Sequence, residues 1–102
     1  MERETFGRDN RTALRFGGQK LNLRPHDADS GVWHTGAVTA PGSQDLCFIS
    51  TVSAEEIASH LTACGITIVE GPVQKHGALG LMSSVYCRDP DANLIEISTY
   101  GD

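Results

Sequence analysis

The sequence predicts an α+β protein built from paired βαβββ modules, with a complete second module and a truncated first one. The second half of the chain holds one helix with clear start and stop signals, placed between strand-like segments. The first part holds only short alternating segments, which match the last three strands of the same module. The length of 102 residues is sufficient for one domain.

The truncated module is assigned to residues 1–24. Its strand-like segments are ETFGRD, RTALRFGG and QKLNLRP. In the third segment Leu21 and Leu23 alternate with polar residues, which is the period of a half-buried strand. Asn10 and a Gly-Gly pair mark the turns between the segments. Residues 25–43 are rich in Pro, Gly, Ser, Asp and Thr and are expected to form a connecting loop, of a length that is usually functional or joins modules.

The complete module is assigned to residues 44–102 and opens with the strand DLCFIST. Its helix begins with a capping box, in which the Ser53 hydroxyl accepts from the Glu56 amide and the Glu56 carboxylate reaches back to Ser53. An apolar stripe with helical spacing follows: Ile57, Leu61 and Cys64. Gly65 ends the helix. The rest is expected to be a strand ITIVEGPV, a loop QKHGALGLM, a strand SSVYCRD, a tight turn DPDAN and a last strand LIEISTY.

Charge and composition restrict the partners and the compartment. The net charge is -5 and the basic residues are scattered, which argues against nucleic acid and against a membrane surface as partners. There is no apolar run of about 18 residues and no secretory leader, so we expect a cytoplasmic location. The three cysteines, Cys47, Cys64 and Cys87, are odd in number and far apart, which predicts reduced, packed thiols rather than disulfides or a thiolate zinc site.

The segment RDPDANLIEIS, preceded by a glycine-containing loop and the strand SSVYC, resembles the C-terminal signature of the vicinal-oxygen-chelate superfamily. This superfamily includes glyoxalase I, bleomycin-resistance proteins and extradiol dioxygenases. The segments RTALRFGGQKLNL and PGSQDLCFIS and the helix followed by EGPV are also similar to its glyoxalase-domain members. The resemblance implies one domain over residues 1–102, in which paired modules curl around a cavity. A divalent metal in that cavity would bind a small-molecule substrate through two adjacent oxygens and act as a Lewis acid.

By this resemblance Glu96 matches the metal-binding carboxylate of the last strand and points into the cavity, with Ile95 and Ile97 facing the opposite way. Asp45 matches a position that is commonly His, and Asn22 matches a third position where other members carry Glu. The plain alternatives are a solvent-facing Glu96 and a strand-start Asp45. Asp suits Mg²⁺ or Mn²⁺ better than Zn²⁺ or Ni²⁺, but the choice among Mg, Mn, Fe, Ni and Zn stays open.

The chain departs from the superfamily pattern at its start. Members open a module with a strand, often carrying a metal-binding His, followed by a helix, and this chain starts after both. The departure removes one ligand and leaves the edge of the QKLNL strand open. Met1 is then an internal residue of a longer protein, or the chain closes its sheet as a homodimer, or it is an inactive remnant. A second departure is Ala92, where the superfamily turn usually has Gly; a positive φ there would cost about 1 kcal/mol.

Other polar side chains are secondary candidates. His76, in the loop expected at the cavity mouth, is a candidate for contact with an anionic substrate or for acid–base chemistry, against a plain surface histidine. Tyr86 and Arg88 share one strand face and are candidate substrate contacts, although Arg88 also suits bracing the following turn. The remaining histidines are expected in the loop, where a third metal ligand is an alternative, or on the wet helix face: His26, His34 and His60.

Together these residues predict a metal-dependent lyase, isomerase or dioxygenase, similar to lactoylglutathione lyase, that acts on a small vicinal-oxygen metabolite with Glu96 as its catalytic carboxylate. The alternative is a metal-free binding or sequestration protein of the bleomycin-resistance type, or an inactive truncated remnant. The missing strand and the Asp at position 45 favour that alternative. No motif supports a serine or cysteine nucleophile.

Overall fold

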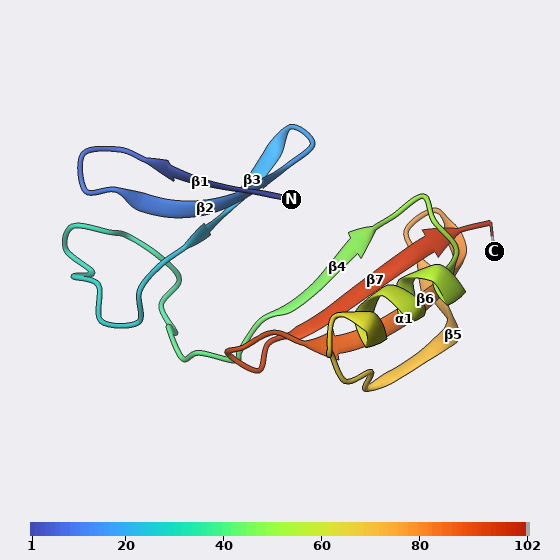
Figure 1. The fold of residues 1–102 in the computed structure, drawn as a ribbon. Coiled ribbons are helices and arrows are strands. Elements are labelled where there is room, and N and C mark those ends of the chain that lie inside the picture. Colours follow the sequence, from blue (N-terminus) through green and yellow to red (C-terminus); the bar gives the residue numbers. More distant parts are fainter. Residues whose placement is uncertain (102) are drawn as a thin grey trace. The chain divides into compact units, whose positions relative to one another are not determined.

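The computed structural model describes residues 1–101 and divides the chain into two compact units, Met1–Thr39 and Ala40–Asp102. Asp102, with which the expected second module ends, lies outside the described residues. Seven strands and one helix occur in residues 1–101 (Figure 1), which confirms the α+β class. The boundary between the units falls inside the expected connecting loop, so most of that loop belongs to the first unit.

The first unit is a three-stranded antiparallel sheet, as expected. Its strands are β1 (Glu2–Phe6), β2 (Arg11–Phe16) and β3 (Gln19–Leu23), in the order β1-β2-β3. Both turns are also where the sequence predicts them, because Asn10 and Gly17 have positive φ angles of 51° and 54°. Residues 24–44 form turns and irregular backbone, which agrees with the expected loop.

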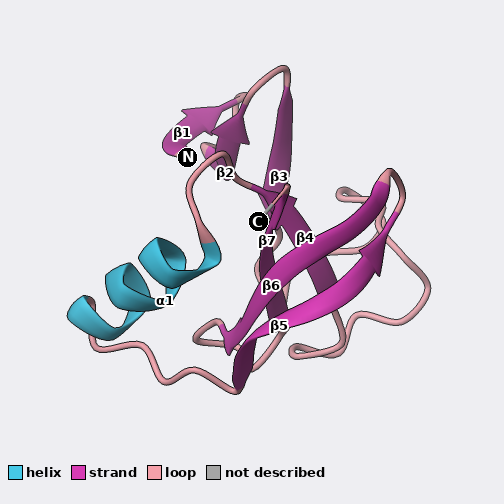
Figure 2. Cartoon of the chain, turned by 90° about the vertical axis from the view of Figure 1, so that its right-hand side faces the viewer, coloured by secondary structure: helices cyan, strands magenta, loops and turns pink. Residues whose placement is uncertain are grey.

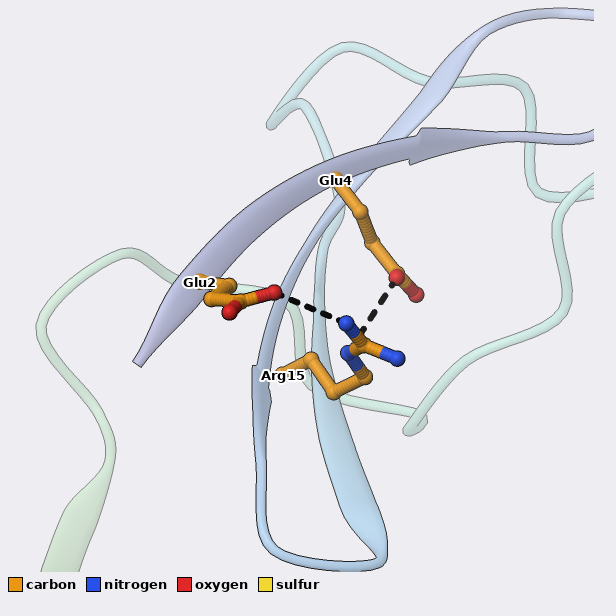
Figure 3. A network of polar contacts seen from close by, with 3 residues as sticks. All are labelled: Glu2, Glu4 and Arg15. Atoms are coloured by element: carbon orange, nitrogen blue, oxygen red, sulfur yellow. Dashed lines mark hydrogen bonds and ion pairs between the residues drawn. The ribbon is translucent and has the colours of Figure 1, made fainter.

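An exposed ion-pair network joins β1 to β2 (Figure 3). Arg15 Nη2 lies 2.8 Å from Glu2 Oε2, and Arg15 Nε lies 3.6 Å from Glu4 Oε2. The strand register sets Glu2 directly opposite Arg15, a favourable cross-strand pair of opposite charges. All three side chains are open to solvent, so such pairs contribute about 0–1 kcal/mol each. The network therefore favours this strand register more than it stabilises the unit.

The second unit is a four-stranded sheet with one helix (Figure 2). Its elements are β4 (Asp45–Ile49), α1 (Ala54–Ala63), β5 (Glu70–Gly77), β6 (Gly80–Arg88) and β7 (Leu94–Tyr100). The strand order is β4-β7-β6-β5, in which β4 runs parallel to β7 and the other neighbours are antiparallel. This is the βαβββ module that the sequence predicts. The helix packs against β5, β6 and β7.

Both ends of α1 are capped where the sequence predicts, although of the expected capping box only the bond to the Ser53 hydroxyl is recorded. At the start, Ser53 Oγ accepts from the Glu56 amide at 3.2 Å. At the end, the Ile66 amide donates to the Leu61 carbonyl at 2.9 Å, and Gly65 has a φ of 76°, which together form a Schellman motif. Cys64 does not join the apolar stripe as expected, since it is the C-cap residue and is exposed. Within residues 1–101 no helix is both long enough and apolar enough to cross a bilayer.

The core of the second unit lies between α1 and one face of the sheet. Its buried members come from the helix and from β6: Ala54, Ile57, Leu61, Val85 and Cys87. Ile95 and Ile97 of β7 pack against this cluster, as does Ile68. Because successive residues of a strand point to opposite faces, Glu96 lies on the face away from the helix. The expectation that Ile95 and Ile97 face away from Glu96 is confirmed.

The sequence-based bounds of β5 are wrong. The strand begins at Glu70 rather than Ile66 and continues to Gly77, through the segment expected as a loop. Gly77 pairs with Gly80 across a two-residue connection, so the two glycines flank a tight hairpin. An added Cβ at Gly77 would meet the Tyr100 hydroxyl at 2.5 Å and Met82 Sδ at 2.7 Å, so any side chain there would displace these two side chains. Glycine at this position therefore reflects close packing of a strand and not the flexibility of a loop.

The turn before β7 requires a left-handed residue, which is Ala92 with a φ of 67°. The Ala92 amide donates to the Asp89 carbonyl at 2.9 Å, which closes the turn. Arg88 Nη1 donates to the Ala92 carbonyl at 3.4 Å, which confirms the bracing role expected for Arg88. The left-handed conformation costs a residue with a Cβ about 1 kcal/mol, as anticipated from the sequence.

Ala92→Gly is expected to raise the free energy of unfolding by about 0.5–1 kcal/mol, because the strain relieved exceeds the extra entropy of an unfolded glycine. Urea unfolding followed by circular dichroism at 222 nm measures the change, since α1 is in the same unit. Ala63→Gly, in the last turn of α1, is the matched control and should lower stability by about 0.5–1 kcal/mol. Destabilisation by both substitutions would contradict a strained Ala92.

Candidate functional site

The site is built on the sheet face opposite α1, around Glu96 in the middle of β7. The register sets Glu96 opposite Cys47 of β4 on one side and opposite Tyr86 of β6 on the other. Ser98, two residues after Glu96 on β7, is paired with Ser84 of β6, and this pair lies on the same face. Three strands that are distant in the sequence therefore bring polar side chains to one carboxylate.

Two buried serines link to Glu96 by hydrogen bonds. Ser84 and Ser98 are both fully buried, and their hydroxyl oxygens are 2.7 Å apart. Ser98 Oγ donates to Glu96 Oε2 at 3.2 Å, and the Ser84 hydroxyl is also a hydrogen-bond donor to this carboxylate. The Cys47 thiol lies 3.6 Å from Ser98 Oγ and is the third polar side chain of this cluster. The hydroxyls therefore act as a donor shell on one side of the carboxylate.

This shell keeps Glu96 charged. Burial raises the pKa of Glu96, but the combined hydrogen bonds outweigh burial and hold the pKa below its usual value of 4.5. The donors come from all three strands: Ser84, Tyr86, Ser98 and Cys47. Burial, followed by the hydrogen bond to Glu96 and the charge of Glu96, raises the pKa of Tyr86 to about 12. At neutral pH the site thus holds a carboxylate beside a protonated phenol.

The cysteines are free thiols, as expected, but only Cys87 is buried, while Cys47 and Cys64 are exposed. The expectation that most of the three thiols are packed is wrong. Burial is the main cause that raises the pKa of Cys47, and the nearby Glu96 carboxylate adds to it. Cys47 is therefore a thiol at neutral pH and a weak nucleophile. It serves Glu96 as a donor.

Asp45 lies on the same face as Glu96, at the start of β4. It pairs with Leu94, two residues before Glu96 on β7, and is exposed. The position of β4 is secured from the turn before β7, because Asn93 Oδ1 accepts from the Gln44 amide at 2.9 Å. The sheet thus supplies two carboxylates on one face, as the sequence predicts for Asp45 and Glu96.

A divalent metal fits these two carboxylates in charge and donor type, since Glu96 is ionised and both offer oxygen ligands. Within residues 1–101 no group of three or more His, Cys, Asp or Glu side chains is arranged to hold a metal. Asp45 and Glu96 are thus candidate ligands of this face and not a complete ligand set.

The other candidates lie outside this cluster. Asn22 is exposed on β3 of the first unit, opposite Ala13. His76 lies in β5 and not in a loop; its partner is Leu81, so it is on the sheet face opposite Glu96. Arg88 is on the Glu96 face, but its contact is to the turn. The side chains that the structure brings together are thus those of Glu96 and Tyr86.

Sequence reasoning missed Ser84, Cys47 and Lys75 as neighbours of this site. Lys75 Nζ is 5.5 Å from the centre of the Tyr86 ring and 3.4 Å from Glu70 Oε1, so it adds a positive charge to the same face. The alternation in the segment SSVYC carries one usable signal, because it puts Ser84 on the same face as Tyr86. The cross-strand register that places both beside Glu96 has no local signal.

Two curated relatives are similar in sequence to most of this chain. A glyoxalase domain-containing protein from Mycosarcoma maydis is 49% identical over 92 residues, which are 90% of this chain and 51% of that protein. A virulence protein from Salmonella typhimurium is 47% identical over 93 residues, 91% of this chain and 63% of that protein. The chain thus spans between about half and two thirds of the length of these curated relatives. No family model matches the chain.

Solved structures agree with the fold. An integron cassette protein from the mobile metagenome of V. cholerae superposes with a TM-score of 0.92 at 42% identity, covering 99% of this chain and 77% of that one. The crystal structure of the Salmonella typhimurium virulence protein superposes with a TM-score of 0.88 at 46% identity, and the match covers 96% of this chain and 75% of that one. Lactoylglutathione lyase from Agrobacterium tumefaciens superposes with a TM-score of 0.68 at 21% identity, and the match covers 97% of this chain and 74% of that one. At this identity the match shows the shared fold alone.

The glyoxalase domain-containing relative and the shared fold define a glyoxalase-domain protein. The chain belongs to the glyoxalase, or vicinal-oxygen-chelate, superfamily, as its C-terminal segment indicated.

Ser98→Ala is expected to raise the pKa of Glu96, because it removes a direct hydrogen-bond donor to the carboxylate. Carbon-13 NMR of the glutamate side-chain carboxyl groups measures the titration. The folded pKa is below the ordinary value of 4.5, so the stabilisation from Glu96 is present above that pH and is lost as the pH falls through the folded pKa. As the pH falls, Ser98→Ala should lose the stabilisation from Glu96 at a higher pH than the wild type does.

Ser83→Ala is the matched control for this experiment. It removes a hydroxyl from the neighbouring position of β6, on the opposite sheet face, and should leave the Glu96 titration in place. An identical Glu96 titration in the wild type and in Ser98→Ala would contradict the donor shell.

Proposed function

We propose that the protein is a metal-dependent lyase or isomerase of the glyoxalase superfamily, similar to lactoylglutathione lyase, with a dioxygenase reaction as the nearest variant. Its substrate is a small metabolite with two adjacent oxygens. The single observation that carries the proposal is Glu96, a carboxylate held in its charged form on the helix-free face of the sheet. A charged carboxylate so placed is able to hold a cation or to accept a proton.

The side chains around Glu96 have complementary tasks in this proposal. Glu96 and Asp45 would hold the divalent metal, which when bound would polarise the substrate oxygens as a Lewis acid. Ser98 keeps one Glu96 oxygen in place through its hydrogen bond. Tyr86 keeps its proton at neutral pH and donates a hydrogen bond to an anionic oxygen. Each of these tasks depends on the Glu96 charge.

The ligands that residues 40–101 do not provide would come from a second module, either in a longer form of the protein or in the partner chain of a homodimer. The relatives support this, because the chain spans only part of their length. Asn22 remains the candidate ligand of the first unit. A cytoplasmic location is part of the proposal and rests on the sequence alone.

A second candidate is a metal-free binding protein of the bleomycin-resistance type. One observation favours it: hydroxyl and thiol donors already surround the Glu96 carboxylate, which is therefore stable without a cation. In this case Glu96 would receive a donor group of the ligand in place of a metal. Ligand binding that persists in the presence of a chelator supports this candidate.

Elemental analysis of the dialysed chain for divalent metals tests the leading proposal. We expect near-stoichiometric metal in the wild type, and a loss of at least about 100-fold in metal affinity in Glu96→Gln. Glu55→Gln, on the exposed first turn of α1, is the matched control and should keep the metal. Metal-loaded protein would then be screened for turnover of 1,2-dioxygenated compounds.

The outcomes separate the two candidates. A folded wild-type chain without metal would overturn the enzyme proposal and leave the binding protein. Equal metal content in the wild type and in Glu96→Gln would place the metal at other residues, against the role given to Glu96.

A further inference from the structure

The irregular segment that follows β3 borders a solvent-open cavity of about 390 Å³ within the first unit. Pockets for small ligands are typically about 300–1,000 Å³, so this size suits one. The polar lining is made of one arginine, two histidines and three hydroxyl residues: Arg24, His26, His34, Ser30, Thr35 and Thr39. These residues are separate from the Glu96 site, and the proposed function does not use the cavity.

The segment around the cavity is ordered by its own contacts. The Trp33 amide donates to the Asp29 carbonyl at 2.8 Å, and the Asp29 carboxylate accepts from the Gly31 amide at 2.8 Å. The Arg11 guanidinium lies 4.1 Å from the centre of the Trp33 ring, which ties the segment to β2. The nearby Asp29 carboxylate therefore has a partner in the backbone and is not a lining residue of the cavity.

Arg24 has donor capacity that the protein leaves unused. Its Nη2 donates to the Ala28 carbonyl at 2.8 Å. Its Nε is buried without a hydrogen-bond partner, and within residues 1–101 no other buried side-chain nitrogen or oxygen shares this state. Leaving a buried donor of a charged group unpaired is costly, and native proteins rarely do so without a functional reason.

The lining charges select an anion. The chain carries a net charge of -5, yet no Asp or Glu lines the cavity. Arg24 is always protonated, and its charge disfavours a metal ion at His26 and His34, the two histidines that the sequence left open as metal ligands. Histidines near neutral pH and hydroxyl groups both donate to oxyanions. The planar guanidinium fork matches a carboxylate or a phosphate.

We propose that this cavity binds a small molecule through a carboxylate or phosphate group, with Arg24 as the charged anchor. The anion accepts from the Arg24 guanidinium. His26, His34 and the hydroxyls complete its shell. The ligand sits in the first unit, so binding does not require Glu96.

Titration of the nitrogen-15-labelled chain with inorganic phosphate, and separately with acetate, tests the proposal by NMR. We expect saturable shifts of the Arg24 Nε–H resonance and of the amides of residues 26–39. Arg24→Gln should weaken binding by at least about tenfold, because a charged anchor is lost. Arg24→Lys keeps the positive charge but not the planar guanidinium, so it should lose less binding affinity than Arg24→Gln. The tighter of the two probes identifies the anionic group.

Arg8→Gln is the matched control, since it removes the same charge from an exposed turn of the first unit outside the cavity. It should bind as the wild type does. Absence of saturable shifts with both probes, or an equal loss in Arg8→Gln, would overturn the proposal. If Arg24→Gln unfolds the first unit, the double variant His26→Gln, His34→Gln decides, with several-fold weaker binding expected and unchanged binding counting against the cavity.

Discussion

The candidate site depends on one asparagine, Asn93, which sets β4 against β7. Its side-chain oxygen accepts from the Gln44 amide at 2.9 Å, and the next residue, Leu94, donates to the Gln44 carbonyl at 3.0 Å. Asn93 is itself held by both carboxylate oxygens of Asp89, at 2.9 Å to its amide and 2.8 Å to its side chain. A shift of β4 by one residue would turn its side chains to the other face and remove Cys47 from the site.

Given that register, the surroundings of Glu96 follow from the alternation of strand residues. The sheet face opposite the helix would normally be wet, yet it carries two fully buried serines. Their hydroxyls are satisfied by each other and by the carboxylate, and such a complete network rigidifies its members. Glu96 is therefore held in one place and one charge state before any ligand arrives. A site with this property needs little reorganisation on binding.

The parts of the fold that depend on neighbouring residues were predictable from the sequence. The two caps of the helix, at Ser53 and Gly65, belong to this group, because capping depends on adjacent residues. The sheet face on which Glu96 lies also belongs to it, because side chains alternate along a strand. The bounds of β5 were not predictable, since its hairpin glycines have the same local signature as a loop and only the pairing with β6 distinguishes them. The same holds for Ser84, whose place beside Glu96 is set by strand pairing between distant segments.

The distribution of chromophores gives each unit its own spectroscopic reporter. Trp33, the one tryptophan of the sequence, belongs to the first unit and lies against Arg11, whereas α1, the one helix of residues 1–101, belongs to the second. Fluorescence therefore reports the melting of the first unit, and far-ultraviolet circular dichroism is weighted toward the second. Coincident melting curves from the two signals would mean that the units unfold as one cooperative body. Two separate melting midpoints would mean that each of the two units folds independently.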